Sequence, residues 1–301
     1  MKSKHSLGLL MSINAAAFWG VVPIVLKYLV TVCRIETIIW FRFCVSFLFL
    51  VAYYCITDPH TLRVIKKPPF LAILAGLALA GNYFGHTTGV QLTSPGSAQT
   101  IIQLGPLLFA IAGVIFFKER LNSRQKIGVA LAISGGLLFY WDQITNLLIA
   151  RAVHVKGDLW IIFAAIVWAV FASFQKILVR RLTPQQANLL IYGVAALFFL
   201  PQTEFGDFVH LSPVDWLLLG FLGANTLIAY GSLAVAIKLI PANHVAVIIV
   251  LNPLVTLAGM AVLAAYQLGW LGVENISLVG YLGAGTMLAG VGLVVAYTRP
   301  H

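Results

Sequence analysis

The sequence predicts an all-α integral membrane protein with ten transmembrane helices, arranged as two inverted repeats of five helices each. Three observations lead to this prediction: an apolar composition, ten apolar stretches of membrane-spanning length, and a repeat that relates the two halves of the chain. Of the 301 residues, 60% are hydrophobic and only 9% are charged, whereas soluble domains carry roughly 25% charged residues. So few charges could not cover a water-soluble protein of this size. A lipid bilayer, by contrast, solvates an apolar exterior.

Ten stretches of the chain approach the length that a helix needs to cross a bilayer, about 20 mainly apolar residues. In the first half these are Leu7–Leu29, Thr37–Ile56, Phe70–Gln91, Ser97–Phe117 and Lys126–Ile144. In the second half they are Leu159–Val179, Gln186–Pro201, Asp215–Ile237, His244–Ala265 and Ile276–Tyr297. The fifth and the seventh are the least regular, because one runs into Asp142 and the other is short. The connections are brief, so no separate soluble domain is expected.

The first stretch follows Lys2 and Lys4, and a basic start before an apolar run is also the pattern of a signal peptide. Two observations oppose that interpretation. The apolar run continues to Val30, which is long enough to span a bilayer, and a copy of the segment recurs in mid-chain. We therefore expect a membrane-spanning helix at the N-terminus.

The distribution of basic residues predicts how the chain lies in the membrane. With the N-terminus in the cytoplasm, fourteen Lys and Arg residues fall on the cytoplasmic side and four on the other, with Arg42 inside a span. This bias is the one that membrane proteins show. It favours both termini in the cytoplasm, in the cell (inner or plasma) membrane. The net charge of +10 is spread over these connections and forms no patch for nucleic acid.

An internal repeat is the most informative feature of the sequence. The first span matches the sixth at an offset of 149 residues, and the third and fourth match the eighth and ninth at an offset of 147. The pairs that recur least by chance are Trp19/Trp168, Lys27/Lys176, Tyr83/Tyr230 and Pro106/Pro253. We expect one repeat over residues 1–150 and another over residues 151–301. Five is an odd number of spans, so the second repeat enters the membrane from the opposite side, as in many transporters. A duplicated structural protein is the alternative.

Several segments resemble the ten-helix EamA-type branch of the drug/metabolite transporter superfamily. They are the Ala-rich stretch that ends at Trp19 and Gly20, Arg42 in the second span, the run from Pro106 that ends in FKERL, and the Gly-rich fifth span after SRQKIG. The resemblance covers nearly the whole chain. It implies export or exchange of amino acids and related metabolites, through a central cavity lined by the first, third and fourth spans of each half.

The chain departs from its relatives in two places. Relatives commonly carry a second-half Glu at the place of Glu119, where this sequence has Tyr266. Small four-helix relatives bind protons and cationic drugs through an acidic residue in their first span, and here that region holds Asn14 and Trp19. No Asp or Glu lies in mid-span, and a cation in a dry cavity needs a carboxylate partner. The sequence therefore argues against this cation chemistry, although aromatic rings can also hold a cation.

Polar and aromatic residues inside the spans are the candidate substrate contacts, because polar atoms cannot face lipid cheaply. Trp19 and Trp168 are expected to line opposite walls of the cavity and to stack on the substrate. For each candidate the alternative is a role in helix packing or in hydrogen bonds between helices. The predicted substrate-binding residues are Trp19, Tyr83, His86, Gln99, Gln103, Trp168, Tyr230 and Asn252.

Three prolines inside the spans, Pro23, Pro106 and Pro253, are the predicted hinges. Each removes a backbone N–H and disturbs the carbonyl four residues earlier, which kinks a helix. A static kink is the alternative. Arg42 lies about one and a half turns from a span end, where its long side chain can snorkel to the interface. A structural role is the first interpretation of Arg42, and attraction of an anionic substrate group is the second.

These observations predict a secondary transporter of small metabolites, most of all amino acids or related zwitterions, working by alternating access as an exporter or exchanger. A larger nucleotide-like, lipid-linked or cationic drug-like substrate is the alternative. No glycine-rich phosphate loop appears, so the chain does not hydrolyse ATP itself. No clustered catalytic groups or metal-ligand spacing appear, so an enzyme, a cofactor and a metal site are not expected. The expected partners are the lipid bilayer and a small-molecule substrate, with the protein acting as a monomer.

Overall fold

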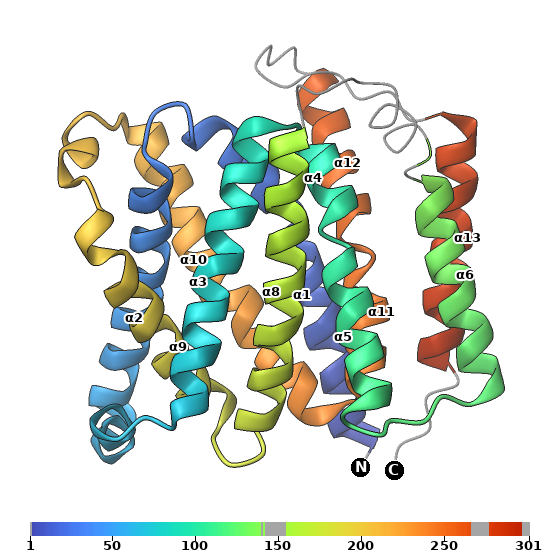
Figure 1. Cartoon of the computed structure of the whole chain (residues 1–301), viewed down its shortest axis with the longest axis horizontal. Helices are drawn as coiled ribbons and strands as arrows, with labels where there is room; N and C mark the ends of the chain where they lie inside the picture. The colour runs from blue at the N-terminus through green and yellow to red at the C-terminus, as the bar shows by residue number, and fades with distance from the viewer. Residues whose placement is uncertain (1, 140, 142–154, 266–276, 297–301) are drawn as a thin grey trace.

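The computed structural model describes residues 2–139, 141, 155–265 and 277–296, and this part of the chain contains helices and no strand. The helices stand side by side in one bundle (Figure 1). The first half consists of α1 (Lys2–Leu29), α2 (Ile35–Thr57), the 3₁₀ helix η1 (Pro59–Lys66), α3 (Phe70–Leu92), α4 (Pro95–Ile101), α5 (Leu104–Ile115) and α6 (Ser123–Phe139). The second half consists of α8 (Val155–Leu178), α9 (Pro184–Phe199), the 3₁₀ helices η2 (Leu200–Gln202) and η3 (Phe205–Val209), α10 (Pro213–Leu239), α11 (Ala242–Ile249), α12 (Asn252–Ala265) and α13 (Leu278–Ala296).

Every predicted apolar stretch coincides with a helix or with a helix pair, and most boundaries agree within a few residues. Seven segments are long and apolar enough to cross a membrane: α1, α2, α3, α4 with α5, α8, α10, and α11 with α12. The prediction of an all-helical membrane protein is therefore confirmed. The α6 and α9 helices are shorter, with 17 and 16 residues, so the count of ten crossings stays a prediction. The predicted ends Ile144, Ile276 and Tyr297 lie outside the described residues, as does Tyr266.

Large apolar side chains cover the outside of the bundle. Phe70, Leu217 and Leu282 are 72%, 72% and 64% exposed. A soluble protein rarely exposes so many large apolar groups together. Lipid is the solvent that such a surface requires.

The two halves of the chain pack against each other along the whole bundle. The α3 helix packs on α8 and α1 packs on α10, while α5 packs on α8 and α1 packs on α12. The α2 helix pairs with α9, and α6 pairs with α13. Each of these contacts joins a helix of one half to a helix of the other. The core of the protein therefore lies at the boundary between the halves.

Two helices are interrupted where proline was predicted to bend them. The α4 and α5 helices are separated at Ile102 and Gln103, and Pro106 is the third residue of α5. The Ile102 carbonyl accepts a hydrogen bond from the Gly105 N–H at 2.9 Å, because Pro106 has no N–H to offer it. In the second half, α11 and α12 are separated just before Pro253. Pro23 differs, because α1 continues through it from Lys2 to Leu29.

One end of the bundle carries most of the exposed positive charge. We call it the basic end: it holds the α2–α3, α5–α6, α8–α9 and α10–α11 connections and lies at the bottom of Figure 1. Its exposed basic residues include Lys66, Lys67, Arg124, Arg180 and Arg181. The α1 helix begins and α13 ends at this end (Figure 1).

Candidate functional site

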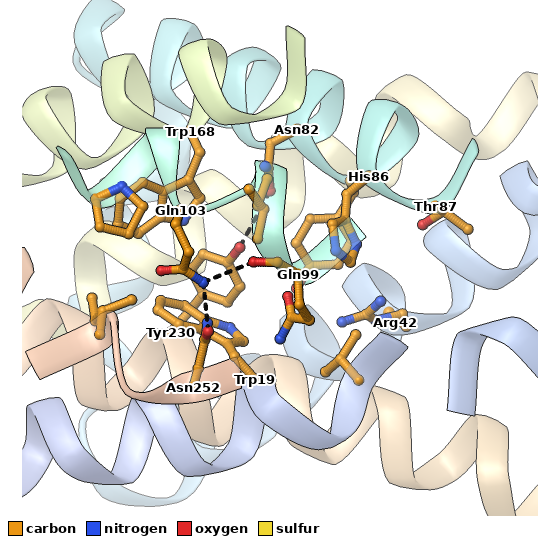
Figure 2. Close-up of a pocket in the computed structure, with 15 residues that line it drawn as sticks. Trp19, Arg42, Asn82, His86, Thr87, Gln99, Gln103, Trp168, Tyr230 and Asn252 are labelled. Atoms are coloured by element: carbon orange, nitrogen blue, oxygen red, sulfur yellow. Dashed lines mark hydrogen bonds between the residues drawn. The ribbon is translucent and has the colours of Figure 1, made fainter. Parts of the chain in front are cut away.

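A cavity lies between the two halves, at the level of the helix interruptions. The cavity has a volume of about 70 Å³. Its wall is formed by Trp19, Val22, Arg42, Asn82, Tyr83, His86, Thr87, Gln99, Ile102, Gln103, Pro106, Trp168, Tyr230, Ile249 and Asn252 (Figure 2). All eight residues predicted as substrate contacts are in this set. The structure thus brings them together, while their role in binding stays a prediction.

Four aromatic rings from different helices form one side of the cavity. The Trp19 ring meets the Trp168 ring edge-to-face, with 5.9 Å between ring centroids, and meets the Tyr230 ring at 5.0 Å. The Tyr83 and Tyr230 rings are 5.7 Å apart. The prediction that Trp19 and Trp168 lie on opposite walls is therefore wrong. The two tryptophan side chains reach across the boundary between the halves and meet there, and with Tyr83 and Tyr230 they form a single aromatic surface.

A chain of side-chain amides and hydroxyls forms another part of the cavity wall. The Gln103 amide donates to the Asn252 carbonyl oxygen at 2.7 Å and to the Gln99 backbone carbonyl at 3.1 Å. The Gln99 amide donates to the Thr256 hydroxyl at 3.0 Å, and this hydroxyl donates to the Gly20 carbonyl at 2.6 Å. These bonds join the interrupted helices of both halves to α1. Gln103 Oε1 is buried and has no hydrogen-bond partner among the described residues, so the network keeps one acceptor for another donor.

A second set of polar groups centres on Thr226 of α10. Its hydroxyl accepts hydrogen bonds from the Tyr83 hydroxyl and from Arg42 Nε, each at 3.1 Å. The Arg42 guanidinium also lies over the Tyr83 ring, 4.3 Å from the centroid. Nearby, the Tyr230 hydroxyl reaches Asn82 Oδ1 at 3.4 Å. Arg42 is therefore fixed in the cavity wall by contacts with two other helices.

Arg42 lines the cavity although it is not among the predicted substrate contacts, because a structural role was its first interpretation. The residue is 3% exposed and lines the cavity, so its side chain does not snorkel to the membrane surface. The ion pairs among the described residues are Arg34–Glu204 and Lys176–Glu119. Arg42 therefore has no carboxylate partner in the described part of the chain. The signal available in the sequence was its position as the one charge inside a span.

At the basic end, Glu119 of the first half binds the second half. Its carboxylate lies 2.6 Å from Lys176 Nζ and accepts hydrogen bonds from the backbone N–H groups of Ala242 and Asn243 at 2.9 and 3.2 Å. These two N–H groups belong to the first turn of α11, where the helix dipole favours a negative charge. The contact holds the two halves together at this end.

At the opposite end, Lys27 makes no equivalent contact with the second half in the described part of the chain. This residue is the repeat partner of Lys176, yet its ammonium donates to backbone carbonyls of its own half, those of Val90, Gln91 and Thr93. Lysine at the C-terminal end of a helix interacts favourably with the helix dipole. The duplicated lysines therefore make different contacts at the two ends.

Comparisons with known proteins agree with this architecture. The model of the EamA-like transporter family matches residues 6–141 and again residues 155–296. The inner membrane transporter YhbE of Escherichia coli (strain K12) is 32% identical over 293 residues, which cover 96% of this chain and 91% of YhbE. A transporter of Haemophilus influenzae is 28% identical over 293 residues, which cover 96% of this chain and 95% of that protein.

A solved crystal structure of a protein with 17% sequence identity has the same fold, with a TM-score of 0.73 over 99% of this chain and 100% of that one. The two family matches together span most of the residues, including every residue of the cavity wall. The chain belongs to the EamA-like transporter family.

Proposed function

We propose that the chain is a secondary transporter of the inner membrane that moves small metabolites, most of all amino acids or related zwitterionic compounds, by alternating access. One observation carries the proposal: an aromatic and polar cavity lies between the two halves at the helix interruptions. Interrupted helices at the centre of a membrane protein are typical of substrate sites in secondary transporters. The inner membrane is the location that the name of the YhbE relative gives.

Equivalent contacts in the two halves support an inverted repeat over residues 1–150 and 151–301. A methyl group added at Gly8 would lie 3.2 Å from Leu239 Cβ, and one added at Gly157 would lie 2.9 Å from Leu92 Cβ. Gly8 and Gly157 are repeat partners, and so are Leu92 and Leu239. The pairs Trp19/Trp168 and Tyr83/Tyr230 each meet at the boundary, as residues near a two-fold axis must.

The arrangement of the ends supports alternating access with the basic end in the cytoplasm. At that end Glu119 of the first half binds Lys176 and α11 of the second. At the other end Tyr28 donates to Asp215 and the Arg34 N–H donates to Asp207, so each end has its own contacts between the halves. Opening at the basic end would require the Glu119 contact to break while the halves rock about the cavity, and opening at the other end would require the Tyr28 and Arg34 contacts to break. Export and exchange both use such a cycle.

The size of the cavity favours a small substrate over the larger alternative. The 70 Å³ that water can reach leaves no room for a nucleotide or a lipid-linked compound without a large rearrangement, because ligand sites for drug-sized molecules have about 300–1,000 Å³. A small metabolite requires less expansion.

The test is a broad metabolite panel on the purified chain, followed by uptake and counterflow in proteoliposomes. We expect thermal stabilisation and a change in tryptophan fluorescence with at least one amino acid or analogue, because Trp19 and Trp168 line the cavity. Trp19→Ala should reduce the transport rate without preventing membrane insertion. A panel that gives neither binding nor flux would remove the basis of the transport assignment.

A further inference from the structure

We propose that the guanidinium of Arg42 is the group that binds the carboxylate of the substrate, so that the cavity selects organic anions over the matching amines and amides. The proposal rests on the proposed transport function and deepens it, because it names the chemical group that a substrate must carry. The amino group of an amino acid then contributes little to binding.

The first argument is the charge of the cavity. Arg42 is 3% exposed and has no ion-pair partner among the described residues. The described residues that line the cavity include no Asp or Glu. A buried charge without a partner is unfavourable in the ligand-free protein. An anion that enters the cavity supplies the missing charge.

The second argument is the number of donors that Arg42 leaves unused. A guanidinium carries five N–H donors. Arg42 Nε donates to the Thr226 hydroxyl and the guanidinium meets the Tyr83 side chain, so most of its terminal N–H donors have no acceptor among the described residues. The two terminal NH₂ groups form the fork that matches the two oxygens of a carboxylate.

The third argument is that the guanidinium is already positioned. Its plane is held by Thr226 on α10 and by the Tyr83 ring on α3. Figure 2 shows it in the same space as the side chains of His86 and Gln99. Binding therefore requires little reordering of the side chain, which favours affinity. His86 can donate to a second ligand oxygen from the same end of the cavity.

The same charge disfavours a cationic ligand. An ammonium held a few ångströms from the guanidinium is repelled, since like charges at about 5 Å interact strongly in a medium of low dielectric constant. The described residues of the wall offer it no carboxylate. The expected order of affinity is therefore anion, then zwitterion, then amide and amine.

The experiment compares ligands that share a carbon skeleton and differ only in charge. For the leucine skeleton these are 4-methylpentanoate, L-leucine, L-leucinamide and isoamylamine, with matching sets for alanine and phenylalanine. Binding to the purified full chain is measured by thermal stabilisation and tryptophan fluorescence. We expect the carboxylates of at least one set to bind 10-fold or more tightly than its amide and amine.

Variants then assign the effect to Arg42. Arg42→Met should weaken carboxylate binding about 100-fold and leave amine binding unchanged or improved, and Arg42→Lys, which keeps the charge but loses the fork, should weaken it about 10-fold. Arg34→Met is the matched control, because Arg34 is exposed and lies outside the cavity. Ligand-free Arg42→Met should be at least as stable as the parent, since it removes an unpaired buried charge.

A structural role for Arg42 predicts the opposite pattern, in which ligand-free stability falls and all ligands weaken together. Amines or amides that bind as well as carboxylates would overturn the proposal and leave the transport function in place. Failure of every set would also overturn it, while flux of any other compound in proteoliposomes would keep the transport function. If Arg42→Met does not fold, the ligand series on the parent chain and on Arg42→Lys decides.

Discussion

At the scale of single residues, Glu119 makes the contact whose removal is expected to have the clearest effect. Its side chain is 12% exposed, and that of Lys176 is 10% exposed. Lys176 also lies near the Phe117 ring, which the Arg180 guanidinium approaches at 5.5 Å. Without the Glu119 charge, the neighbouring cations Lys176 and Arg180 would have no anion beside them to compensate their charge.

Glu119→Gln should therefore destabilise the protein by about 3 kcal/mol, because removal of one member of a buried pair leaves the other charge uncompensated. The measurement is the midpoint of thermal unfolding in detergent. The double variant Glu119→Gln/Lys176→Met should lose less than Glu119→Gln alone, since neither charge then remains. Equal losses in both would mean that the Lys176 charge left without Glu119 does not lower stability.

A matched control for this prediction is Glu204→Gln. Glu204 pairs with Arg34 at 3.8 Å, and the two side chains are 52% and 65% exposed. Exposed pairs contribute about 0–1 kcal/mol, so this variant should unfold close to the parent. A control that fell as far as Glu119→Gln would show that removal of any carboxylate lowers stability.

The sequence predicts the residues of the cavity better than their arrangement. Polar groups within a span must avoid lipid, and this rule alone brought Tyr83, His86, Gln99 and Asn252 into the candidate set. It does not give distances between helices, which is why Trp19 and Trp168 were placed on opposite walls. Arg42 was first interpreted as a structural residue for a similar reason. Its contacts, Thr226 and Tyr83, are on two other helices, and only tertiary packing brings them together.

At the scale of helices, proline and glycine gave the most reliable signals. Pro106 and Pro253 follow the interruptions of both broken helices, because proline cannot donate to the helix ladder. Pro23 gave no interruption, so the residue type alone does not decide. The glycines of the fifth and tenth spans allow neighbouring helices to approach closely. In the structure α6 packs on α13, and a methyl group added at Gly283 would lie 2.7 Å from the Gly135 carbonyl oxygen.

This close approach gives a prediction for α13. Gly283→Ala should destabilise the protein by about 1–3 kcal/mol, the usual result of overpacking, because the added methyl group meets backbone atoms that cannot move aside. Gly285→Ala, two residues away, meets no atom within 4 Å. It should be neutral or more stable by up to about 1 kcal/mol through helix propensity.

Thermal unfolding of both variants, prepared in parallel, distinguishes the two positions. Because both replace glycine by alanine in one helix, any general effect of the substitution cancels. Equal behaviour of the two variants would mean that α6 and α13 are not in close contact at Gly283.

At the scale of the whole molecule, the sequence predicts the symmetric features and misses the asymmetric ones. Composition and repeat lead directly to a membrane protein with paired helices, because both depend on many residues at once. Lys27 and Lys176 make different contacts because of one residue, Glu119. The equivalent position in the second half of the sequence is not acidic. A repeat pattern averages over such single differences. They are also the features that distinguish one end of a transporter from the other.

The membrane orientation of the two halves is the last prediction. Single cysteines are placed at Lys67 and Arg181 on the basic end and at Thr31 and Val209 on the opposite end, so that each end is sampled once in each half. All four parent residues are exposed. In whole cells, a membrane-impermeant maleimide should label positions 31 and 209, and positions 67 and 181 only after permeabilisation, because basic connections stay in the cytoplasm.

A separate variant that keeps native Cys33 as its one cysteine, with Cys44 and Cys55 replaced, provides a control for this experiment. Burial and the nearby Asp207 carboxylate raise the pKa of the Cys33 thiol to about 12. Only the thiolate reacts, so labelling of Cys33 at pH 7.5 should be slow, and it should accelerate only as the pH approaches the raised pKa. Labels at positions 67 and 181 that appear on different sides of the membrane would contradict the inverted arrangement of the halves. The shared cavity would then have no symmetric route to both sides.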